Sequence, residues 1–257
     1  MDKFVNSLTA EQKYAYDRIL EGENVLIFGQ GGSGKSYLVE GIQDERTLCL
    51  APTGMAAINM CSRARTIHSI LQIGEKSLQA FNWEKVHQHI SKKKIRLREF
   101  FDDYDRIIID ECSMIISGLL NTLIKTFNLV YETDSSILFN GKQIIFIMDP
   151  LQLPCVKNSL EPYLDMTIHQ KNELAESDYI VNNPDFKRLF NKELGNIVHF
   201  KGNKRCDDYE WCEVLSACRT GFKECNHREK SKYLRILNVR RVSMSDCYDK
   251  HSDNTNH

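Results

Sequence analysis

The amino-acid sequence predicts an α/β fold in which a doubly wound, mostly parallel β-sheet is flanked by helices. Five short apolar runs, rich in β-branched residues, alternate with stretches of helical spacing, which is typical of a parallel sheet covered on both faces. The 257 residues are enough for one large α/β domain with an appendage. The runs are "NVLIF" (24–28), "TLCLA" (47–51), "RIIID" (106–110), "QIIFIM" (143–148) and "NIVHF" (196–200).

The segments between these runs predict helices and a tail. Residues 9–22 form a predicted helix that Thr9 caps and Gly22 ends, and residues 113–130 repeat apolar side chains at helical spacing. The segment 83–101 is basic; we interpret it as a solvated helix face, with phosphate contact as the lesser alternative. Patterning fades after residue 235, so 236–257 is expected to be a disordered tail.

Composition excludes several classes of protein. The formal net charge is −1, so any nucleic-acid contact must come from a local groove. The start of the chain has no apolar signal region, which together with nine cysteines indicates an intracellular protein with reduced thiols. No apolar run approaches the roughly 20 residues that cross a membrane. The cysteines at 206, 212, 218 and 225, with His227, lack the close pairs of zinc sites and are interpreted as structural thiols.

The strongest motif is "GQGGSGKS", which follows a predicted strand and opens a predicted helix. It fits the phosphate loop G-x-x-x-x-G-K-S, whose amides surround a phosphate while the lysine reaches the β- and γ-phosphates and the serine ligates Mg²⁺. We therefore predict ATP and Mg²⁺ as ligands. The nucleotide-binding residues would be Gly29, Gln30, Gly31, Gly32, Ser33, Gly34, Lys35 and Ser36.

The run "RIIIDECSM" ends a buried strand on two adjacent acids. Neighbouring residues at a strand end point in different directions, so Asp110 could hold Mg²⁺ with Ser36 while Glu111 polarises the attacking water. The alternative is an ordinary acidic turn, which we disfavour because the strand lies downstream of a phosphate loop. Glu111 thus favours hydrolysis over a kinase reaction.

Four further stretches resemble motifs of superfamily-one DNA helicases. "LTAEQ" resembles the adenine-reading Q motif, "APTGMAA" with "TIHS" resembles motif Ia and its extension, "DECSM" resembles motif II, and "MDPLQLPCV" resembles motif III. Together they resemble the petite-integration-frequency (PIF)-like helicases over residues 8 to about 221. The resemblance implies that residues 1–200 are the first RecA-like motor domain of a helicase moving 5′ to 3′ on single-stranded DNA.

The resemblance also implies roles for single residues. Gln12 would bind the adenine edge. Asp149 and Gln152 would lie between the γ-phosphate and the DNA path, with Gln152 sensing the γ-phosphate through a hydrogen bond. "FKGNKRCDDYEWCEVLSACRTG" resembles motif IV, which would make Arg205 the residue that reaches the γ-phosphate and 201–235 a segment leading toward a second motor domain. The DNA backbone would be contacted by Pro52, Thr53, Gly54, Thr66 and His68.

The sequence departs from the family pattern in three places. Met148 stands for the usual glycine of motif III and Cys155 for its second proline, and the stretch after Gly221 is too short for a second RecA-like domain. Two functions therefore stay open: an ATP-hydrolysing helicase acting on single-stranded DNA and DNA junctions, or a truncated nucleotide- and DNA-binding module without motor activity. A second polypeptide could supply the missing domain. The expected location is the nucleus in a eukaryote, and otherwise the cytoplasm or a virus-infected cell.

Overall fold

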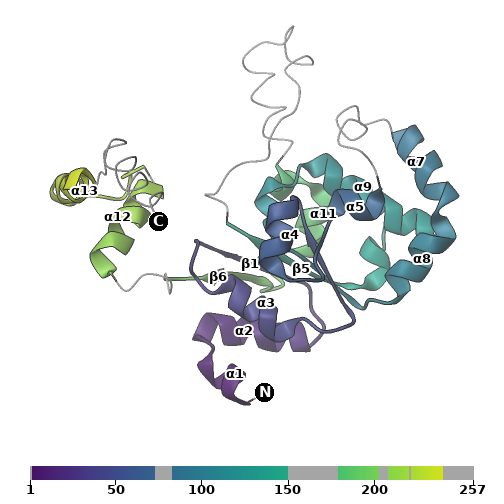
Figure 1. Cartoon of the computed structure of the whole chain (residues 1–257), viewed down its shortest axis with the longest axis horizontal. Helices are drawn as coiled ribbons and strands as arrows, with labels where there is room; N and C mark the ends of the chain where they lie inside the picture. Colours follow the sequence, from purple (N-terminus) through teal and green to yellow (C-terminus); the bar gives the residue numbers. More distant parts are fainter. Residues whose placement is uncertain (1, 73–82, 150–178, 203–207, 220, 240–257) are drawn as a thin grey trace, which may run out of the picture. The chain divides into compact units, whose positions relative to one another are not determined.

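The computed structural model describes residues 2–72, 83–149, 179–202, 208–219 and 221–239 (Figure 1). The chain divides into two compact units, residues 1–202 and 203–257. The first contains the β-sheet and the described residues of the candidate site. No helix within the described residues is long and apolar enough to cross a membrane.

The sheet of the first unit has six strands in the order β3-β2-β4-β5-β1-β6, and all of its ladders are parallel. All five predicted strands are confirmed, and the predicted fold class with them. The additional strand, β3, has only two residues and therefore leaves no apolar run in the sequence. The strands are β1 (Val25–Gly29), β2 (Thr47–Ala51), β3 (Arg65–Thr66), β4 (Arg106–Ile109), β5 (Gln143–Met148) and β6 (Ile197–Phe200).

Helices cover both faces of the sheet, as Figure 1 shows for α2 and α3 on one side and α9 on the other. The first face packs against α1 (Asp2–Ser7), α2 (Ala10–Leu20) and α3 (Lys35–Ile42). The second packs against α5 (Ile67–Leu71), α7 (Trp83–Lys92), α8 (Lys94–Asp102), α9 (Ser117–Tyr131) and α11 (Pro184–Leu189). The short helix α4 (Gly54–Met60) follows β2. The described part of the unit also has three short 3-10 helices: η1 (Cys112–Met114), η2 (Leu138–Gly141) and η4 (Ile180–Asn182).

Alternating strand residues divide the apolar core into two layers. In β4, Ile107 and Ile109 enter the larger layer beneath α9, whereas Ile108 enters the layer beneath α2 and α3. All three are fully buried. This is why the runs are continuously apolar: successive side chains of a strand point to opposite faces, and here both faces are covered.

Two of the predicted helices are each divided into two segments in the structure. The helix predicted over 113–130 is a 3-10 turn followed by α9, because Ile115 and Ile116 are extended between them and Ile116 bridges to Tyr179. The basic segment 83–101 forms two helices that meet at Lys93. Helical spacing alone does not reveal such interruptions, since the apolar positions continue through them.

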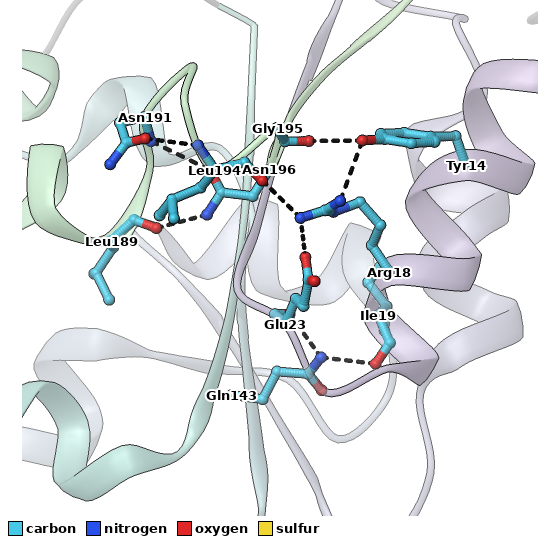
Figure 2. Close-up of polar contacts among 10 residues, drawn as sticks. All are labelled: Tyr14, Arg18, Ile19, Glu23, Gln143, Leu189, Asn191, Leu194, Gly195 and Asn196. Carbon is cyan, nitrogen blue, oxygen red and sulfur yellow. Dashed lines mark hydrogen bonds and ion pairs between the residues drawn. The ribbon is translucent and has the colours of Figure 1, made fainter.

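A polar network fastens α2 to the amino ends of β5 and β6 (Figure 2). Arg18 Nη2 donates to the Leu194 carbonyl oxygen at 2.7 Å, and the Tyr14 hydroxyl donates to the carbonyl oxygen of Gly195 at 3.0 Å. Gln143 Nε2, at the start of β5, donates to the carbonyl oxygens of Ile19 in α2 and of Glu23 in the loop after it, each at 2.7 Å. The helix that carries Gln12 is therefore fixed against the sheet.

The second unit contains α12 (Tyr209–Arg219) and α13 (His227–Val239). Lys232 of α13 pairs with Glu210 of α12 at 3.0 Å. Helix α12 lies within the motif IV-like segment 201–235. Helix α13 continues to Val239, past residue 236, where the sequence predicted that a tail begins.

Candidate functional site

The β1–α3 loop has the backbone of the predicted phosphate loop. Gly32 and Gly34 adopt left-handed φ angles of 82° and 89°, which glycine adopts without steric cost. Gly29 is required for another reason, because a Cβ there would lie 2.6 Å from the carbonyl oxygen of Phe200. Gln30 and Gly31 are half-buried, Ser33 is buried, and Ser36 is exposed in the first turn of α3. The predicted strand, loop and helix are confirmed, while the nucleotide contacts stay predictions.

Lys35 begins α3, and its ammonium group lies over the loop. Nζ donates to the carbonyl oxygens of Gly29 at 2.7 Å and Gln30 at 3.0 Å. The loop therefore holds the lysine at the mouth of the turn, next to the amino end of α3, where backbone N–H groups and the helix dipole favour an anion.

Asp110 and Glu111 follow β4, and the backbone turns sharply between them. The Asp110 amide donates to the Leu50 carbonyl oxygen at 2.9 Å, and Asp110 Oδ1 accepts a hydrogen bond from the Glu111 amide at 2.8 Å. Glu111 then adopts a left-handed conformation, with φ 50° and ψ 37°. That conformation costs a residue with a side chain about 1–2 kcal/mol. Such strain at a strand end is frequent at functional sites, where the surrounding structure maintains it.

Asp149 brings a third carboxylate to this edge of the sheet. It follows β5, which lies between β4 and β1, and it is fully buried. Burial raises the pKa of Glu111; the charges of Asp110 and Asp149 raise it further, whereas the charge of Lys35 lowers it. Burial likewise raises the pKa of Asp110, against the opposing effects of the Glu111 amide and of Lys35. Lys35, Asp110, Glu111 and Asp149 thus form one interacting group, which we call the acidic cluster.

The donor atoms at this edge suit a magnesium ion. Mg²⁺ prefers oxygen ligands and is usually held by one or two carboxylates together with phosphate oxygens. Asp110 offers a carboxylate at the end of β4, and Ser36 offers a hydroxyl in the first turn of α3. The residues predicted to hold the metal therefore fit it chemically.

Gln12 lies in a different environment from the one its predicted role suggests. It is fully buried, its Oε1 accepts a hydrogen bond from the Thr9 amide at 3.0 Å, and its Nε2 donates to the Gly34 carbonyl oxygen at 3.2 Å. The Gln12 amide in turn donates to the Thr9 hydroxyl at 3.3 Å, which completes a capping box. Gln12 therefore joins α2 to the phosphate loop. The T-x-x-Q spacing signals the capping box; adenine recognition stays a prediction.

The residues predicted to contact DNA lie after two neighbouring strands, β2 and β3. Thr53 caps α4 by accepting from the Ala56 amide at 3.2 Å, and Thr66 caps α5 by accepting from the Ser69 amide at 3.1 Å. Pro52 and His68 are half-buried, and Gly54 is exposed. Because β2 and β3 are parallel neighbours, both turns lie at the same edge of the sheet. Gln152 and Arg205, two predicted catalytic residues, lie outside the described residues.

The fold and the site together define a class of protein. A parallel doubly wound sheet has a phosphate loop after β1 and carboxylates after β4 and β5, at the carboxyl edge where open α/β sheets bind ligands. This is the architecture of a RecA-like P-loop NTPase.

Comparison with known proteins identifies the family within this class. The family model described as PIF1-like helicase matches residues 7–181, and the chain belongs to that family. It is 32% identical over 213 residues to the ATP-dependent DNA helicase Pif1 of Bdellovibrio bacteriovorus. The matched region covers 79% of this chain and 46% of that protein. It is 31% identical over 154 residues to ATP-dependent DNA helicase PIF1 of Xenopus laevis, covering 58% of this chain and 23% of that protein.

Solved structures agree on the fold. A crystal structure of Pif1 helicase from Bacteroides in complex with ADP-AlF3 and single-stranded DNA matches with a TM-score of 0.66 and 24% identity, over 96% of this chain and 57% of that one. The Bacteroides sp. Pif1 complex with ADP-AlF4 matches with a TM-score of 0.57 and 25% identity, over 82% and 45%. The chain thus spans about half the length of the Bdellovibrio relative and less than a quarter of the Xenopus one.

Proposed function

We propose that this chain binds ATP with Mg²⁺ and hydrolyses it as the first motor domain of a PIF1-like DNA helicase. The observation that carries the proposal is the acidic cluster, because it joins the phosphate loop to carboxylates from two further strands. A phosphate-binding loop alone would suit many nucleotide-binding proteins. A strained glutamate beside a buried aspartate and the loop lysine suits the activation of water at the γ-phosphate.

Each residue would have a distinct part in hydrolysis. Lys35 would exchange its carbonyl partners, Gly29 and Gln30, for β- and γ-phosphate oxygens. Ser36 and Asp110 would hold Mg²⁺, which neutralises charge that develops on the phosphates. Glu111 would orient the attacking water and accept its proton.

We further propose that DNA binds along the turns after β2 and β3. Pro52, Thr53, Gly54, Thr66 and His68 would contact the sugar-phosphate backbone, and contacts of that kind position a strand without reading its sequence. The support is their common edge of the sheet, together with relatives solved with single-stranded and forked DNA. Movement from 5′ to 3′, and the roles of Gln152 and Arg205, are expectations from the family. The second motor domain would come from more of the same protein or from another polypeptide.

The test measures ATP binding and ATP hydrolysis of the 257-residue chain, with and without single-stranded DNA. Lys35→Ala should abolish ATP binding. Glu111→Gln should retain it and slow hydrolysis by about 10²–10⁴, the usual contribution of a general base. Lys13→Ala and Glu40→Gln serve as controls. Each makes the same change of charge as Lys35→Ala or Glu111→Gln, respectively, but at the protein surface. Hydrolysis by Glu111→Gln at the wild-type rate would overturn the assignment. Binding of both ligands without DNA-stimulated hydrolysis would favour the alternative function, a nucleotide- and DNA-binding module.

A further inference from the structure

A small basic cavity lies at the β3 edge of the sheet, on strands other than those that carry the acidic cluster. It opens between the start of α5 and the first turns of α8, and its volume is about 80 Å³. Arg65 of β3, Lys93 between α7 and α8, and Arg96 of α8 supply its charges, beside Ser69 and the ring of Phe100. Nothing in the proposed ATP chemistry uses these residues.

The three cations of the cavity differ from their basic neighbours in their partners. Lys94 pairs with Glu132 and Arg98 with Asp102, both outside the cavity lining. Within the described part of the chain, neither Arg65, Lys93 nor Arg96 forms an ion pair with a carboxylate. No described carboxylate therefore neutralises their positive charge.

Two of these side chains are held in place by uncharged groups. The Arg65 guanidinium lies 5.3 Å from the centre of the Phe100 ring, a cation–π contact that fixes its plane without neutralising its charge. Lys93 Nζ donates to Gln72 Oε1 and lies 3.0 Å from His89 Nε2. Two of the three cations of the cavity are thus positioned by contacts within the fold, while Arg96 is exposed on α8.

The start of α8 adds positive potential to the same place. Lys93 is its N-cap residue and forms no side-chain capping hydrogen bond, and the first turn has no acidic residue. Cations at the positive end of a helix are unfavourable, and an anion there would be favourable. The pKa of His89 is lowered by burial and then by the charges of Lys93 and Lys92, in agreement with a positive local potential. An anion there would complement the start of α8, whereas His89 and Lys92 complement the negative end of α7, which meets it at Lys93.

The size of the cavity restricts the ligand. Its 80 Å³ exceeds the roughly 10–15 Å³ that one water needs, and is far below the roughly 300–1,000 Å³ of pockets that enclose a drug-sized ligand. A single phosphate group therefore suits it better than a base or a whole nucleotide. Guanidinium groups also match phosphate oxygens in two-point hydrogen bonds.

We propose that this basic cavity binds one backbone phosphate of DNA, adjacent to the nucleotides contacted by Thr66 and His68. The inference rests on the proposed DNA-binding function, since Arg65 directly precedes Thr66 and Ser69 lies one residue beyond His68. The strand path would then extend from the turns after β2 and β3 onto the start of α8.

The test measures binding of a labelled single-stranded oligonucleotide by fluorescence anisotropy over a range of salt concentrations. The double variant Lys93→Gln with Arg96→Gln should bind several-fold more weakly. Its slope of log affinity against log salt should be smaller by about 0.7, the change for one lost phosphate contact on a single strand. The matched control, Lys94→Gln with Arg98→Gln, removes two charges from the same helix and should retain the wild-type slope. ATP binding should be unchanged in both.

A second readout is the imidazole resonance of His89, followed by NMR during titration with DNA or with inorganic phosphate. DNA should raise the pKa of His89 in the wild type and in the control variant. An unchanged salt slope in the double variant that lacks Lys93 and Arg96 would overturn the inference. A response to inorganic phosphate without one to DNA would also overturn it, in favour of a free-anion site. Wild-type protein that binds ATP but no DNA would refute the proposed DNA function itself.

Discussion

Replacing Gln12 with alanine should destabilise the protein even when no nucleotide is present. The side chain is fully buried and joins the Thr9 amide to the Gly34 carbonyl oxygen. Loss of the capping contact costs about 1 kcal/mol, and loss of the hydrogen bond to Gly34, whose carbonyl oxygen still accepts from the Leu38 amide, costs about 1 kcal/mol. We therefore expect a loss of about 2 kcal/mol, which lowers Tm by roughly 4–8 °C in a domain of this size.

The assay is urea unfolding followed by far-ultraviolet circular dichroism, in nucleotide-free buffer. Thr9→Ala should cost about 1 kcal/mol, because it removes the hydroxyl acceptor and leaves the contact with Gly34. Gln88→Ala, at an exposed position of α7, should stay within about 0.5 kcal/mol of wild type. If Gln12→Ala unfolds at the wild-type urea concentration but binds ATP more weakly, Gln12 acts on the nucleotide alone and the structural reasoning is wrong.

Three further predictions test the loop, the core and a titrating group. Gly29→Ala places a Cβ 2.6 Å from the Phe200 carbonyl oxygen and should cost about 1–3 kcal/mol in thermal unfolding. Phe127→Ala empties a fully buried site that three other aromatic rings contact, and should cost about 3–5 kcal/mol in urea. The pKa of His89 is lowered in the folded protein, so the unfolded chain takes up its proton first as pH falls. The titration of His89 should therefore lower the stability from pH 7 to 5, so that stability falls more, or rises less, in the wild type than in His89→Gln.

Each of these three predictions has a control variant or a result that would contradict it. A Cβ at Gly54 meets no atom within 4 Å, so Gly54→Ala should not destabilise the fold. Ile95 is 76% exposed, and Ile95→Ala should leave the urea midpoint nearly unchanged. Equal pH dependence in wild type and His89→Gln would show that the environment of His89 does not alter its titration.

Much of the fold could be predicted from the sequence because its signals are local. A buried parallel strand is a short, continuously apolar run, and such runs marked β1, β2, β4, β5 and β6. Strand β3 has two residues and leaves no such run. The division before α9 was also not predictable, because Ile115 and Ile116 continue the apolar spacing of a helix while the backbone there is extended.

The candidate site, like the fold, could be predicted from the sequence only in part. The chemical groups of the site could be predicted from the sequence: the loop motif requires its glycines, Lys35 and Ser36, and Asp110 with Glu111 ends a buried strand. Which of these groups lie together depends on the packing of the whole sheet. Strand order is set by packing over the whole sheet, and it places β5 between β4 and β1, so that Asp149 joins Glu111 and Lys35. The same long-range packing buries Gln12 against the phosphate loop and brings Arg65 and Arg96 to one cavity, because contacts between distant segments leave no periodicity in the chain.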